Sequence, residues 1–203
     1  MPNPSILLVP TLTELEWTIK PQLERWADVA SYDAPGVGDE PRTEMTPEGI
    51  SKRGLEEIDR RGWKRVVIVA DEAGVAQAVR LAALRPAMVA GVALGHAVLS
   101  FEHRGDRAPL NAEVLSGLIG IARADYRSYV RALTQVTQHA YDDEFADRYM
   151  ERVPQDVALV YVEQLLDGAS AEDLEPALRS LSAPKLLVEH SGCLLWTREG
   201  FED

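Results

Sequence analysis

The stretch Trp63-Lys-Arg-Val-Val-Ile-Val-Ala-Asp-Glu-Ala-Gly-Val-Ala-Gln-Ala-Val-Arg-Leu-Ala-Ala-Leu-Arg-Pro86 decides the fold of this chain. Its apolar run at residues 65–70 predicts a strand buried on both faces, and the alanine-rich run after Gly74 predicts a helix. A sharp turn at residues 71–73 joins the two. The helical pattern ends at Pro86, before a second apolar run at residues 89–94. The stretch therefore predicts a strand, turn, helix and strand of a parallel sheet.

The size and composition of the chain bound its organisation. With 203 residues, 46% of them hydrophobic, the chain can bury one sizeable core, so we expect one domain with a small insertion. The formal charge of −12 disfavours nucleic acid and anionic membranes as partners, because both would be repelled. A single cysteine, Cys193, rules out an internal disulfide and favours a cytoplasmic protein.

Five short apolar runs predict a parallel sheet flanked by helices, an α/β fold. The runs are residues 6–9, 29–32, 65–70, 89–94 and 185–188. Between Phe101 and Ser182 only helical patterns follow one another. We therefore expect a core made of residues 1–100 and 183–203, and a helical cap made of residues 101–182.

Three blocks of sequence resemble the α/β-hydrolase family. Residues 5–13 with Trp17 resemble its first strand and oxyanion loop, and Asp33, Gly36 and Gly38 match the spacing of its D-x-x-G-x-G turn. Residues 70–74, Ala-Asp-Glu-Ala-Gly, stand where the family has its nucleophile elbow, G-x-S-x-G between strand and helix. The resemblance implies the hydrolase fold with a cap, no cofactor, and a small-molecule ligand or substrate.

The departures from the family pattern concern its catalytic groups. Glu72 replaces the nucleophilic serine, and Thr11 replaces the usual oxyanion-loop glycine. No acid follows the fifth strand at the expected place, where Gly192 and Cys193 stand. The sequence stops at Asp203, so the family's last strand and helix, and the catalytic histidine that follows that strand, are expected to be missing. Either the natural chain is short, or this is a fragment of a longer chain that carries the histidine.

The candidate site residues follow from the same alignment. Glu72 is the candidate catalytic residue, and Thr11, Leu12, Ala73 and His96 are expected around the pocket and the oxyanion region. Glu72 can be a carboxylate nucleophile, as aspartate is in dehalogenases and epoxide hydrolases of this fold, although its oxygen lies farther out by about 1.5 Å. The alternative is a residue that only caps the following helix. Asp71 is expected to be a solvent-side helix cap.

No cofactor or metal is expected. Ala34-Pro-Gly-Val-Gly38 does not make the G-x-G-x-x-G of a dinucleotide site, and no histidines and acids have metal-ligand spacing. A His190–Cys193 pair is a weaker catalytic candidate, because nothing orients the histidine.

Three functions remain open from the sequence. The first is a non-catalytic hydrolase homologue that binds a small apolar molecule between core and cap. The second is an active hydrolase that uses Glu72 as a carboxylate nucleophile or as a water-activating base, on an ester, epoxide or halide substrate. The third is a scaffold that forms a homo-oligomer through an open sheet edge.

Overall fold

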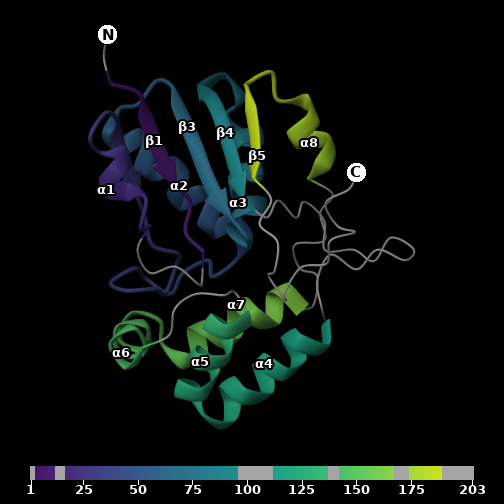
Figure 1. Ribbon diagram of the computed structural model, residues 1–203. Helices are drawn as coiled ribbons and strands as arrows, with labels where there is room; N and C mark the ends of the chain where they lie inside the picture. The colour runs from purple at the N-terminus through teal and green to yellow at the C-terminus, as the bar shows by residue number, and fades with distance from the viewer. Residues whose placement is uncertain (1–2, 12–16, 96–111, 137–141, 167–173, 189–203) are drawn as a thin grey trace.

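The computed structural model describes residues 3–11, 17–95, 112–136, 142–166 and 174–188. A parallel five-stranded sheet with the order β2-β1-β3-β4-β5 forms its centre (Figure 1). Its strands are β1 (Ser5–Leu8), β2 (Asp28–Ser31), β3 (Val66–Asp71), β4 (Val89–Gly95) and β5 (Lys185–Val188). The predicted α/β fold with a parallel sheet is confirmed.

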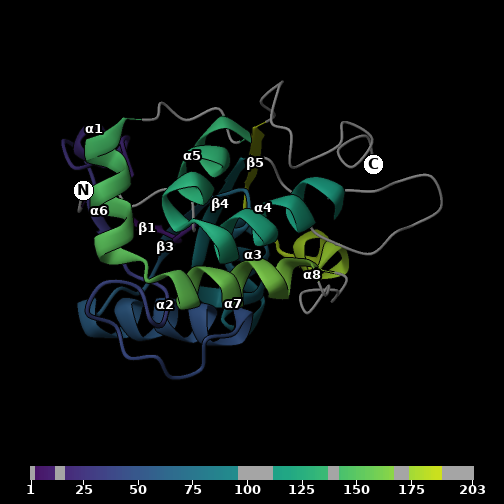
Figure 2. The same cartoon turned by 90° about the horizontal axis from the view of Figure 1, so that it is seen from below.

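Helices cover both faces of the sheet (Figure 2). The helices α2 (Pro47–Arg61), α3 (Gly74–Leu84) and α8 (Glu175–Ser180) lie on one face, and α1 (Lys20–Leu23) lies on the other. A short 3-10 turn, Pro86–Met88, leads into β4. Because side chains alternate along a strand, Leu7 packs toward α2 and α3, whereas Leu8 packs toward α1.

Local chemistry sets the ends of α2. The hydroxyl of Thr46 accepts a hydrogen bond from the Gly49 N–H at 3.1 Å, and Pro47 follows at the first helical position. Gly62 ends the helix in a left-handed conformation with φ 66°, which glycine adopts without strain. Both signals, a threonine before a proline and a glycine after the last turn, are present in the sequence itself.

The helices α4 (Ala112–Ala124), α5 (Tyr126–Val136), α6 (Asp143–Arg152) and α7 (Gln155–Leu166) lie beyond the carboxyl ends of the strands (Figures 1 and 2). They share one hydrophobic cluster with Ala34 and Val37, which follow β2, and with Ile50 of α2. Tyr126 and Tyr129 stack with ring centroids 5.6 Å apart inside this cluster. Helix α8, which lies within the range predicted for the cap, packs on the sheet instead. The division of the chain at residues 101 and 182 stays a prediction.

Two hydrogen bonds anchor α7 to the segment that follows β2. The Tyr161 hydroxyl donates to the Pro35 carbonyl at 2.8 Å, and the Gln164 side-chain amide donates to the Met45 carbonyl at 2.6 Å. Gly36 lies against Val157, since a Cβ on this glycine would be 3.2 Å from a methyl group of that valine. The turn after β2 is therefore the surface on which the helices α4–α7 are attached.

Strand β5 differs from the sequence prediction. The side chains of Leu186, Leu187 and Val188 are 59%, 58% and 50% exposed, so the expected burial of all five strands on both faces is wrong here. The reason is position, because β5 is last in the sheet and pairs with β4 on one side. The homo-oligomer expected from an open edge stays a prediction. None of the helices described combines the length and the apolar character needed to cross a membrane.

Candidate functional site

Glu72 lies in the tight turn between β3 and α3. Asp71 is the last residue of β3 and Gly74 the first of α3, so two residues reverse the direction of the chain. The backbone of Glu72 has φ 44°, a left-handed conformation that costs a side-chain-bearing residue about 1 kcal/mol. The residue is only 5% exposed. The sharp turn predicted from the sequence is present, and its glutamate is buried rather than solvated.

Hydrogen bonds around the turn hold this conformation. The Glu72 N–H donates to Asp71 Oδ1 at 2.9 Å and to the Gly95 carbonyl at 3.1 Å, and the Val75 N–H donates to the Glu72 carbonyl at 3.1 Å. Asp71 and Gly95 are partners in the β3–β4 register. A Cβ on Gly95 would lie 2.5 Å from Asp71 Oδ1, so the carboxylate occupies the space that glycine leaves.

The start of α3 packs directly on the segment after β1. A Cβ on Gly74 would lie 3.0 Å from the Pro10 carbonyl oxygen and 3.5 Å from Thr11 Cγ2. The structure therefore brings Thr11 close to the turn that contains Glu72 and Ala73. Leu12 and His96 lie outside the described residues. The roles assigned to these five positions stay predictions.

The capping roles predicted for the acids need correction. The N-cap residue of α3 is Ala73, and it makes no side-chain capping bond, so Glu72 does not occupy the capping position. Asp71 is not a solvent-side cap of the helix either. It is half-buried at the end of β3, and its carboxylate accepts from the Glu72 N–H.

A cavity of about 440 Å³ lies between the ends of β1 and β2, the region of α1 and the end of α6. The segment after β1 contributes Pro10 and Thr11 to its wall, and helix α6 and its C-cap contribute Arg152 and Val153. The remaining lining residues come from the region of α1 and the end of β2: Trp17, Lys20, Pro21, Glu24, Ser31, Tyr32, Asp33, Ala34 and Val37. Thr11 belongs to the lining, whereas Glu72 does not.

Asp33 and Arg152 form an ion pair across this cavity's wall. Arg152 Nη2 donates to both carboxylate oxygens of Asp33 at 2.6 Å, and the Gly38 N–H donates to the Arg152 carbonyl at 2.7 Å. Burial raises the pKa of Asp33 above its ordinary value, and Arg152 opposes that shift only in part, while Glu40 and Asp39 add to it.

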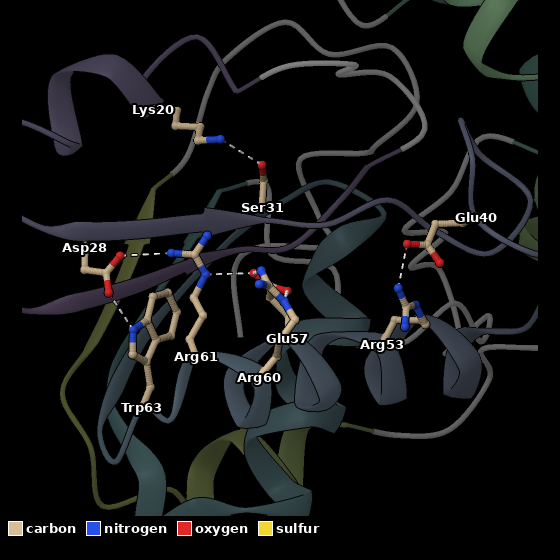
Figure 3. A network of polar contacts seen from close by, with 9 residues as sticks. All are labelled: Lys20, Asp28, Ser31, Glu40, Arg53, Glu57, Arg60, Arg61 and Trp63. Carbon is tan, nitrogen blue, oxygen red and sulfur yellow. Dashed lines mark hydrogen bonds and ion pairs between the residues drawn. The ribbon is translucent and has the colours of Figure 1, made fainter.

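Lys20 supplies a second cation to the lining. Its Nζ donates to Ser31 Oγ at 3.3 Å, a long hydrogen bond (Figure 3). The same Nζ lies 4.0 Å from a Glu24 carboxylate oxygen. Sequence reasoning identified neither Lys20 nor Arg152 as a site residue. Nothing in the sequence around either residue indicates such a role. The partner of Arg152, Asp33, is 119 positions away in the chain.

Within the described ranges, no group of three or more histidines, cysteines, aspartates or glutamates could hold a metal ion.

Solved structures share this arrangement, although no protein-family model and no curated protein matches the chain. A hydrolase from Oleispira antarctica superposes with TM-score 0.76 at 16% identity, over 97% of this chain and 76% of its own. A bromoperoxidase from Bacillus anthracis gives 0.71 at 14% identity, over 95% and 75%. A bottromycin epimerase in complex with bottromycin A2 gives 0.62 at 15% identity, over 93% and 83%. At these identities the likeness shows a common fold alone.

Proposed function

Because the chain has the α/β-hydrolase fold, we propose that it binds a small molecule between the carboxyl edge of its sheet and a cap formed by α4–α7, without serine-type hydrolysis. The cavity of about 440 Å³ carries this proposal. Its volume is in the range of small-molecule sites, and its place beyond the ends of parallel strands is where open α/β sheets bind their ligands.

The chemistry of the turn supports a function without serine-type hydrolysis. Glu72 stands at the corner between β3 and α3, and a carboxylate has no hydroxyl that a base could activate for acyl transfer. Fold does not determine activity. The epimerase among the solved relatives is one protein of this fold whose name denotes another reaction and whose structure contains a small molecule.

The binding proposal is tested by filling the cavity. Ser31 lines it from an exposed position, so Ser31→Trp introduces an indole without replacing a core side chain. Ser180→Trp, on the exposed side of α8, is the matched control. In ligand-observed NMR with a fragment library, we expect bound fragments to lose affinity about ten-fold or more in Ser31→Trp and to keep it in Ser180→Trp. Equal binding by both variants, or no binding fragment, would contradict the proposal.

The absence of serine-type hydrolysis has its own assay. We expect the full chain to release 4-nitrophenol from 4-nitrophenyl acetate no faster than Glu72→Gln does. Hydrolysis of 4-nitrophenyl acetate by the full chain that Glu72→Gln abolishes would overturn this part of the proposal. It would not affect the proposal that the cavity binds a small molecule.

A second candidate is covalent catalysis by Glu72. The observation that favours it is a carboxylate held buried in a left-handed corner, since strained residues collect at functional sites. In this reaction a Glu72 oxygen attacks the carbon of a haloalkane, the carbon–halogen bond breaks with loss of halide, and water then hydrolyses the ester. Trapping with a bromoalkane and mass spectrometry should give an adduct on Glu72. An unmodified Glu72 across a panel of halides and epoxides would remove this candidate.

A further inference from the structure

The sheet has two edge strands, β2 and β5, and they differ in the side chains that they expose. Strand β2 buries its apolar residues Val29 and Ala30 and exposes Asp28 and Ser31 at its ends. The Asp28 carboxylate also pairs with Arg61 at 3.0 Å (Figure 3). Charged and polar side chains on an edge strand disfavour pairing with a further strand. Strand β2 therefore has the character of a protected edge.

Strand β5, the last strand of the sheet in Figure 1, lacks this protection. Leu186, Leu187 and Val188 are each at least half exposed, and Lys185 is the only charged residue of the strand. Because side chains alternate along a strand, Leu187 lies on one face of the sheet and Leu186 and Val188 lie on the other. Both faces of this edge therefore present apolar side chains that a neighbouring strand would cover.

The backbone of β5 turns every second residue away from the sheet. The Val92 N–H donates to the Pro184 carbonyl at 3.0 Å, so the Pro184 carbonyl faces β4. Because consecutive residues of a strand direct their N–H and C=O groups to opposite sides, Lys185 and Leu187 direct theirs outward. No strand lies on that outer side within the described ranges. A further strand there would pair with the N–H and C=O groups of Leu187.

We propose that β5 pairs antiparallel with β5 of a second copy of this chain, across a two-fold axis perpendicular to the sheet. The two five-stranded sheets then join into one. In this arrangement Leu187 lies opposite the partner's Leu187, and the two residues exchange both N–H···O bonds. On the other face, Leu186 lies opposite the partner's Val188. The contact uses the same strand of each copy and therefore closes at a dimer.

The sequence of β5 is complementary to itself in this register, because apolar residues meet apolar residues on both faces. Lys185 and the partner's Lys185 are then four residues apart along the strands, about 13 Å, which exceeds the screening length of about 8 Å at physiological salt. A register centred on Leu186 instead places Lys185 opposite the partner's Leu187 and brings the two lysines within about 7 Å along the strands. The charge and the apolar residues of β5 therefore both favour the register centred on Leu187.

The contact is small, and its size sets its strength. The described part of β5 spans four residues, about 13 Å, whereas a stable interface buries about 800 Å² on each partner. The net charge of −12 adds a repulsion between the copies, which salt weakens. We therefore expect a reversible dimer with a dissociation constant on the order of 10 to 100 µM, tighter at higher salt.

Sedimentation velocity of the full chain over about 1 to 500 µM tests the proposal, and we expect a monomer–dimer equilibrium without larger species. Leu187→Lys places like charges opposite each other and should weaken the dimer about ten-fold or more, and Leu187→Glu should do the same. Ile19→Lys is the matched control, since it replaces an exposed apolar residue at the start of α1, beside the other edge of the sheet. It should leave association unchanged.

An equimolar mixture of the two charged variants tests the register. Opposite charges then face each other across the axis, so the mixture should dimerise again, within about three-fold of the natural affinity. Restored association would also show that both variants fold, which a general loss of structure at position 187 could not give.

Four outcomes would overturn the proposal. They are a natural chain that stays monomeric at the highest concentration, a dimer that Leu187→Lys leaves intact, and oligomers that grow beyond two copies. The fourth is a mixture whose two variants keep the circular dichroism spectrum of the natural chain but do not associate. None of these results bears on ligand binding in the cavity, which the fragment library tests separately.

Discussion

The guanidinium of Arg152 and the carboxylate of Asp33 connect the end of α6 to the turn after β2. Both Asp33 oxygens accept from Nη2 at 2.6 Å, although the residues are 119 positions apart in the chain. The side chains are 34% and 35% exposed, so the pair is partly desolvated and partly screened. It holds the helices α4–α7 at the wall of the cavity.

Removing the cation should destabilise the protein more than an ordinary surface change. Arg152→Met keeps an apolar stem but leaves Asp33 half-buried without its partner, so we expect the unfolding free energy at pH 7 to fall by about 1 kcal/mol. Arg148→Met, one turn earlier on α6, removes an exposed pair with Glu144 and should cost less than about 0.5 kcal/mol. Urea unfolding measures both free energies. Equal losses would show that the Arg152–Asp33 pair contributes no more to stability than the exposed Arg148–Glu144 pair does.

The raised pKa of Asp33 predicts a dependence on pH. Because burial raises the folded-state pKa above the ordinary 3.8, the protonated carboxyl favours folding, and this contribution is lost as pH rises through the folded-state pKa. Asparagine does not titrate. The unfolding free energy of Asp33→Asn minus that of the natural chain should therefore increase from below pH 3.8 upward through the folded-state pKa. Urea unfolding at a series of pH values measures it, and a flat or decreasing difference would contradict the assignment.

Elements with local causes could be predicted from the sequence. Thr46 caps α2 because its hydroxyl reaches a backbone N–H three residues later, and Gly62 ends it because glycine adopts φ 66°. The turn at Glu72 was predictable for a related reason, since a buried strand and a helix meet there within two residues. Each cause lies within a few positions of its effect.

Features that depend on distant partners could not be predicted. Leu186 and Leu187 have the composition of a buried strand, yet their exposure depends on which elements lie beside β5. The cavity depends on α6 returning to the end of β2, and no pattern around Arg152 indicates that partner. The candidate Glu72 could be located from the sequence, whereas the cations of the cavity could not.

The left-handed backbone of Glu72 predicts an unusual order of stability between two variants. Glu72→Gly and Glu72→Ala both remove the carboxylate, but glycine adopts φ 44° without a Cβ clash, so the glycine variant should be more stable by about 1 kcal/mol. At the neighbouring Ala73, with φ −62°, Ala73→Gly should instead cost about 0.5 to 1 kcal/mol. Thermal or urea unfolding decides, and an alanine variant at position 72 as stable as the glycine variant would mean that the turn relaxes.

Gly95 should be intolerant of a methyl group because of Asp71. The Cβ of Gly95→Ala would lie 2.5 Å from Asp71 Oδ1 and 3.0 Å from its Cγ, so the carboxylate must leave the Glu72 N–H. We expect a loss of about 2 kcal/mol in unfolding free energy. Gly117→Ala in α4, where a Cβ meets nothing within 4 Å, should instead stabilise by up to about 1 kcal/mol.

A double-mutant cycle identifies Asp71 as the cause. In the Asp71→Ala background the clash and the hydrogen bond are both absent, so Gly95→Ala should cost about 1 kcal/mol less than in the natural chain. Urea unfolding of the four proteins gives the coupling energy. Simple additivity of the two costs would mean that the methyl group is rejected by something other than the carboxylate, and that Asp71 does not hold the corner in which Glu72 lies.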